Sequence, residues 1–184
     1  MKSKSFFGFT LSLFFRLFMT DLGCFVLTLF AGAISQNRYV RVGAQIICFV
    51  ALISIIYSFC YKIGESDAPL AKTGHRKYNP YKGLTAGLIA DAPFLLSGIA
   101  IIVGKAFGIF ENFVGYYKLI NAFFAPINNI LLTSDLSLVE YSWADTIISV
   151  SMLLLVPIIS MLSYYLGLEQ FSFTEKLFYK KLEK

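Results

Sequence analysis

The chain has 184 residues, of which 57% are hydrophobic, 17% aromatic and only 15% charged, with a net charge of +5. A soluble domain carries about 25% charged residues, so this composition excludes an ordinary soluble protein. Because a membrane span needs about 20 apolar residues, the chain has room for four spans and their connections. We therefore expect one membrane domain, 1–184.

The first apolar stretch runs from Phe6 to Ile34 and is longer than one untilted span requires. Arg16 and Asp21 interrupt it, so we expect two pieces. The first is a segment along the membrane surface from Phe6 to Phe15, and the second is a span over 16–35. In this arrangement the long Arg16 side chain reaches the headgroups.

The clearest span is 42–61, which contains no charged residue. A cytoplasmic loop, 62–82, follows, and its turn-forming residues argue against a continuous helix: Gly64, Pro69, Gly74 and Pro80. One interpretation of this loop is a solvated connector. The other is a partner-binding surface that is built from Glu65, Asp67, His75, Arg76 and Lys77.

The third predicted span, 83–103, carries a carboxylate within its apolar run, at Asp91. An isolated charge near the bilayer centre costs about 2.5–3.5 kcal/mol on insertion scales, so Asp91 is expected to face a helix bundle or a cavity. Gly83 and Gly87 precede Asp91 at intervals of four residues, which places all three on one helix face. This small-residue face predicts close packing against another helix.

Two interpretations of Asp91 stay open. In the first, Asp91 forms a structural hydrogen bond to a neighbouring Ser, Thr, Tyr or Arg. In the second, it is a proton or cation site within the membrane. Arg16 is a candidate counter-charge for Asp91, and Asp21 is an equally good partner for Arg16.

The predicted outer segment, 104–142, holds seven aromatic residues between Phe107 and Phe124. Their spacing predicts an amphipathic helix in the outer interface that ends before Pro126. A broken or re-entrant segment is the alternative, and half-helices of that kind often build transport sites. The fourth span, 143–166, follows and contains Pro157.

The cytoplasmic tail, 167–184, completes the chain. Ser172 and Glu175 have capping-box spacing, which predicts a short amphipathic helix in this tail.

The distribution of basic residues predicts the orientation. Two lysines precede the first span, five Lys and Arg lie in 62–82 and four lysines lie in the tail, whereas four basic residues fall on the opposite side. Short basic loops stay in the cytoplasm, so both termini are expected there. The basic residues lie beside spans, which favours contact with lipid headgroups over nucleic-acid binding.

Few residues offer other chemistry. Cys24, Cys48 and Cys60 lie in apolar segments with spacings that match neither a zinc site nor a redox pair, so no disulfide, metal or cofactor is expected. An intramembrane enzyme would need a second polar group at the depth of Asp91, and the sequence identifies none. No catalytic residue is therefore predicted, and a non-enzymatic role is favoured.

Three pieces of the chain, Gly64–Asp67, Lys82–Pro93 and Tyr164–Lys181, together resemble small uncharacterised polytopic membrane proteins of bacteria. The resemblance is one of layout and local pattern. It implies a multi-pass protein of the bacterial cytoplasmic (inner) membrane. It brings no activity and no functional residues with it.

These observations predict an all-α integral membrane protein with four transmembrane helices and an interfacial amphipathic helix between the third and the fourth. The expected function is that of a small transport component or a subunit of a membrane complex. Its partners would be the lipid bilayer and either another membrane protein or further copies of the chain. The alternative is a regulatory or scaffolding protein that binds a partner through the cytoplasmic loop and tail.

Overall fold

The computed structural model describes residues 5–34, 37–75, 78–109, 112–132 and 137–170. These residues form helices joined by short turns, without a strand among them. In chain order the helices are α1 (Phe6–Ile34), α2 (Arg38–Lys72), α3 (Lys82–Ala90), α4 (Ala92–Phe107), α5 (Phe113–Ile120), η1 (Ala122–Phe124), α6 (Ala125–Leu131), α7 (Trp143–Ser151), η2 (Met152–Leu154) and α8 (Leu155–Leu168). The predicted helix in the tail falls at 171–184 and lies outside the described residues.

Three helical stretches are long and apolar enough to cross a membrane: Phe6–Ile34, Tyr39–Lys72 and Trp143–Leu168. The helices α3 and α4 are long and apolar enough only when taken together, and they meet at a bend of 60°. If this bent pair is one broken span, it is a fourth candidate. Many large apolar side chains on these helices are exposed, as expected for surfaces that face lipid. The all-helical prediction is confirmed for the described residues, with three or four candidate spans.

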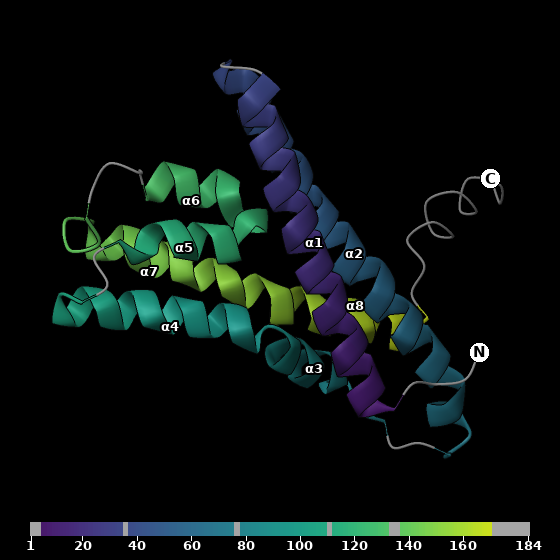
Figure 1. Cartoon of the computed structure of the whole chain (residues 1–184). Helices are drawn as coiled ribbons and strands as arrows, with labels where there is room; N and C mark the ends of the chain where they lie inside the picture. Colours follow the sequence, from purple (N-terminus) through teal and green to yellow (C-terminus); the bar gives the residue numbers. More distant parts are fainter. Residues whose placement is uncertain (1–4, 35–36, 76–77, 110–111, 133–136, 171–184) are drawn as a thin grey trace, which may run out of the picture.

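The antiparallel helices α1 and α2 run side by side along most of their length, and α4, α5, α6 and α7 form a layered group on one side of this pair (Figure 1). The stretch from α7 through η2 to α8 continues beneath the pair, where α8 packs against α2 and α3. The short helix η1 contacts both α1 and α2. The core therefore lies where the long pair meets the remaining helices.

The predicted break in the first apolar stretch is wrong, since α1 is one helix of 29 residues. Phe9, Leu13 and Leu17 recur every four residues and are all buried, so one continuous face packs into the bundle. The Arg16 guanidinium lies 4.5 Å from the centre of the Phe59 ring on α2. This cation–π contact accommodates the charge that was expected to divide the stretch.

The second helix also differs from its prediction, because α2 continues beyond Tyr61 to Lys72. Ile63, Asp67 and Ala68 in the added part are buried, and α2 packs extensively against α8. Packing thus overrides the weak local preference of the turn formers for a loop. Pro69 is tolerated close to the end of the helix, where few backbone hydrogen bonds remain to be lost.

The third apolar segment is divided at Asp91 into α3 and α4. Pro93 occupies the first turn of α4, where a proline is favoured because its missing N–H has no helical partner there. The same ring cannot follow an unbroken helix, since it would clash with the carbonyl group four residues earlier. The bend of 60° follows from this position of Pro93.

The aromatic segment after α4 is not one helix. Gly108, with a φ of 65°, ends α4 in the left-handed conformation that glycine favours. The chain then forms α5, η1 and α6, and Pro126 lies in the first turn of α6, so the helix expected to end before Pro126 is replaced by one that begins beside it. Phe123 and Phe124 are fully buried, so this end of the segment packs inside the bundle.

Candidate functional site

Asp91 lies at the bend between α3 and α4 and is fully buried, with 0% of its surface exposed. Neither oxygen of its carboxyl group has a hydrogen-bond partner in the described part of the chain. Asp91 also precedes α4 without capping its backbone N–H groups. Most buried polar groups in proteins are hydrogen-bonded, so this carboxyl group is the most unusual polar feature of the bundle.

The face that leads to Asp91 packs closely against α8. A Cβ atom placed on Gly83 would lie 2.5 Å from the carbonyl oxygen of Ser160, and one placed on Gly87 would lie 2.8 Å from the Cα of Pro157. Only a residue without a side chain fits at these two positions. The Ser160 hydroxyl oxygen is also buried without a hydrogen-bond partner among the described residues.

The structure does not join Arg16 or Asp21 to Asp91. The Arg16 guanidinium packs on Phe59, and a carboxylate oxygen of Asp21 accepts a hydrogen bond of 3.4 Å from the backbone N–H of Phe123 in η1. Asp21 thus lies at the start of that short helix, and the expected pairing of Arg16 with either carboxylate is absent from the described contacts. Asp91 keeps no counter-charge among them.

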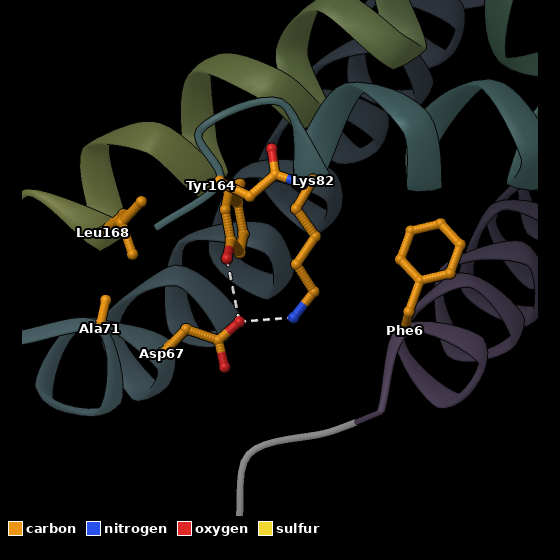
Figure 2. A pocket seen from close by; sticks show the side chains of 7 residues that line it. Phe6, Asp67, Ala71, Lys82, Tyr164 and Leu168 are labelled. Carbon is orange, nitrogen blue, oxygen red and sulfur yellow. Dashed lines mark hydrogen bonds and ion pairs between the residues drawn. The ribbon is translucent and has the colours of Figure 1, made fainter. Parts of the chain in front are cut away.

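A buried ion pair joins α2, α3 and α8 near the ends of these helices (Figure 2). The Lys82 ammonium lies 2.5 Å from a carboxylate oxygen of Asp67, and the Tyr164 hydroxyl donates a hydrogen bond of 2.9 Å to the same oxygen. The ammonium also lies 5.8 Å from the ring centre of Phe9. Asp67, Lys82 and Tyr164 line a cavity of about 320 Å³ together with Phe6, Ala71, Asn79 and Leu168.

The proposed partner-binding surface is therefore divided. Glu65 and His75 are exposed, whereas only 2% of the surface of Asp67 is exposed because this residue forms the ion pair inside the bundle. Arg76 and Lys77 lie outside the described residues. Asp67 was assigned to the surface because the sequence predicted a loop at the position where α2 continues.

A second buried polar network connects α4, α5, α6 and α7. The Asn121 side-chain amide donates to the Ser97 hydroxyl at 2.9 Å, and the Ser149 hydroxyl donates to the Asn128 side-chain oxygen at 2.7 Å. The Tyr117 hydroxyl donates to the backbone oxygen of Ser149 at 3.1 Å. Sequence reasoning missed this network, because Tyr117, Asn121 and Asn128 meet Ser97 and Ser149 through the breaks between α5, η1 and α6, which the sequence did not predict.

The Lys105 side chain, near the C-terminal end of α4, joins this helix to the segment that precedes α7. Its buried ammonium donates hydrogen bonds to three backbone carbonyl groups, those of Leu138, Val139 and Tyr141. It also lies 5.2 Å from the ring centre of Trp143, at the start of α7. Lys105 therefore fixes the chain that leads into the last apolar stretch and is not a solvated loop residue.

The described residues contain no group of three or more His, Cys, Asp or Glu side chains that could hold a metal ion. Cys24, Cys48 and Cys60 are buried free thiols. Comparison with protein-family models, curated proteins and solved structures finds no match to this chain. The candidate site is thus argued from its geometry, with Asp91 at its centre.

Proposed function

We propose that this chain is a non-enzymatic transport component of a bacterial cytoplasmic membrane and that Asp91 takes up and releases the transported or coupled cation. One observation carries the proposal: a fully buried carboxyl group without a hydrogen-bond partner lies where a candidate span is broken. Ionisable groups within the membrane are costly and most often mark ion or substrate pathways.

The geometry of the break supports this role. Discontinuous helices that meet near the middle of the membrane are a recurrent way to build sites for ions and substrates. Asp91 is the junction residue of this break, since it ends α3 and precedes α4. A buried carboxyl group without a counter-charge can gain a proton or bind a small cation in its place.

The arrangement of the whole chain follows from the same proposal. The pair α3 and α4 is the third of four spans, the segment from α5 to α6 lies towards the outer side, and both termini are cytoplasmic, as the basic residues predict. Four spans enclose little space for a substrate path. We therefore propose that the chain works as a homo-oligomer or together with another membrane protein.

Ion flux in proteoliposomes tests the proposal. Flux of H⁺ would be followed with an internal pH dye and flux of Na⁺ with a radioactive tracer, each under an imposed membrane potential. We expect one of the two ions to move faster than in protein-free vesicles. The Asp91→Asn variant should reduce this protein-dependent rate at least about tenfold, which is equivalent to roughly 1.4 kcal/mol.

The matched control is Asp145→Asn, which removes a carboxylate from the first turn of α7 and should leave the flux unchanged. Circular dichroism and size-exclusion chromatography would establish that both variants are folded. Equal flux in Asp91→Asn and the unmodified protein would contradict the proposal, as would vesicles that conduct neither ion.

A partner-binding regulator is the second candidate. Its supporting observation is a pair of hydrogen bonds at one end of the bundle, which tie the end of α2 and the connector that follows it to the end of α8. Lys72 donates a hydrogen bond of 2.8 Å to Gln170, and Tyr78 donates one of 2.8 Å to Glu169. Loss of a co-purifying protein on substitution of Glu65 and His75, with normal ion flux, would favour this candidate.

A further inference from the structure

A cavity of about 350 Å³ lies between α1, α4 and α5, away from the buried ion pair. One wall is a face of α1 that carries Phe14, Phe18, Asp21 and Phe25. These four residues are spaced by four, three and four positions, as one side of an α-helix requires. Phe94 of α4 and Leu119 of α5 contribute to the opposite side.

Packed aromatic rings line this cavity, and they differ in how far they are exposed. The rings of Phe14 and Phe18 stack at 6.3 Å between centres, and the ring of Phe94 packs on that of Phe123 at 5.2 Å. Phe94 is 4% exposed, whereas Phe18 is 45% exposed. Phe94 therefore forms the floor of the cavity and Phe18 lies at its opening.

Asp21 supplies the single acidic group among the residues that line this cavity. A carboxyl oxygen of Asp21 accepts a hydrogen bond of 3.4 Å from the N–H of Phe123, which orients the group. The nearest basic residue along α1, Arg16, directs its guanidinium onto the ring of Phe59 instead. The cavity thus combines one carboxyl group, which a bound cation would hold in its ionised form, with an apolar, aromatic surface.

We propose that this cavity binds an amphipathic organic cation, such as a quaternary ammonium or phosphonium ion with apolar substituents. The carboxylate attracts the positive centre, and the faces of phenylalanine rings attract cations most strongly when water is excluded. The volume is within the usual range of about 300–1,000 Å³ for small-molecule pockets. An acyl chain would gain nothing from Asp21, and an anion would be repelled by it.

This assignment names a substrate class for the transport role proposed above, and its physiological meaning rests on that role. The cavity reaches α4 at Pro93 and Phe94. Both residues lie in the first turn of α4, directly after the bend at Asp91. Binding at Asp21 and ion exchange at Asp91 would therefore act on the same bend. The binding step can nevertheless be measured without transport.

Equilibrium dialysis of the purified protein with radioactive tetraphenylphosphonium tests the assignment. We expect saturable binding of about one cation per chain, weakened by at least about tenfold in Asp21→Asn because the charge is lost. Leu119→Trp keeps the carboxylate but fills the cavity and should weaken binding similarly. The control Asp145→Asn, in the first turn of α7, should bind as the unmodified protein does.

Neutral triphenylphosphine oxide is the second probe, and it should bind more weakly than the cation. Equal binding of the two probes, or unchanged cation binding in Asp21→Asn, would overturn the assignment and identify the cavity as a general apolar or lipid site. If Asp21→Asn does not fold, Leu119→Trp decides alone, since Leu119 is 47% exposed and tolerates a larger side chain. Unchanged cation binding in a folded Leu119→Trp variant would likewise overturn the assignment.

The two proposals fail separately. Cation binding that depends on Asp21, in a protein that conducts neither H⁺ nor Na⁺, would overturn the transport proposal and support the binding site. Ion flux that depends on Asp91, in a protein without tetraphenylphosphonium binding, would overturn the site and leave the transport proposal standing.

Discussion

Asp67 and Lys82 show how this bundle holds opposite charges in its interior. The two charged groups are 2.5 Å apart, and Tyr164 adds a hydrogen bond from the third helix. Burial removes most of the water that would solvate each group. The attraction between the two charges offsets this cost, and the loss of either partner leaves the other charge buried and uncompensated. The pair therefore links α2, α3 and α8 in one arrangement.

Removal of one member of this pair is expected to destabilise the bundle. Lys82→Met leaves the Asp67 carboxylate buried without its ammonium partner and should lower the free energy of unfolding by roughly 3 kcal/mol. The double variant Asp67→Asn/Lys82→Met removes both charges and should recover most of this loss. Denaturant titration in detergent, followed by circular dichroism, measures both changes.

The matched control is Lys72→Met, because Lys72 is exposed and makes its hydrogen bond to Gln170 at the surface. This change should alter the free energy of unfolding by no more than about 0.5 kcal/mol. A double variant as unstable as Lys82→Met alone would show that lost packing of the lysine stem, and not the unpaired charge, causes the effect.

At the level of single residues, the sequence identified Asp91 because a charge inside an apolar run is costly and therefore conspicuous. It also placed Gly83 and Gly87 on the same face as Asp91. The ion pair of Asp67 could not be predicted, since its two members lie fifteen positions apart and meet only because α2 extends past its expected end. Side-chain pairing across helices depends on packing that one-dimensional spacing does not contain.

Close helix crossings stabilise the bundle at the level of its elements. Gly64 of α2 lies against the backbone of Tyr164, and Gly167 of α8 lies against the backbone of Tyr61. A Cβ atom at either position would meet a backbone carbonyl oxygen, which cannot rotate away as a side chain can. The two helices approach each other closely because both positions are glycine.

Gly167→Ala should therefore separate α2 from α8 and lower the free energy of unfolding by about 1–3 kcal/mol. Gly43→Ala is the control on α2, since a Cβ atom there meets nothing within 4 Å. It should be neutral or stabilising by up to about 1 kcal/mol, because alanine favours the helix. Thermal unfolding in detergent compares them, and equal stability of both variants would show that the crossing tolerates a side chain.

The ends of the helices were predicted less well than their existence. Pro126 was a correct signal for a boundary, yet it begins a helix where it was expected to follow one. Arg16 did not divide α1, because the ring of Phe59 on a neighbouring helix accommodates its charge. Local signals mark the positions where a helix is weak, and tertiary contacts decide whether it breaks there.

At the level of the whole molecule, composition and length predicted an all-helical membrane domain. The described chain contains three helices that are long enough to span, or four if α3 and α4 form one broken span. Charge counting alone provides the proposed orientation. The transport proposal depends most on the bent pair, because Asp91 can carry ions across the membrane only if its segment crosses.

Cysteine accessibility on both sides of this pair is the most direct measurement. In a chain with Cys24, Cys48 and Cys60 replaced by alanine, single cysteines would be placed at the exposed positions His75, before α3, and Ile109, after α4. A membrane-impermeant maleimide should label Ile109→Cys in intact spheroplasts and His75→Cys only after lysis. Labelling of both from the same side would make α3 and α4 a re-entrant pair and would contradict the proposed path through Asp91.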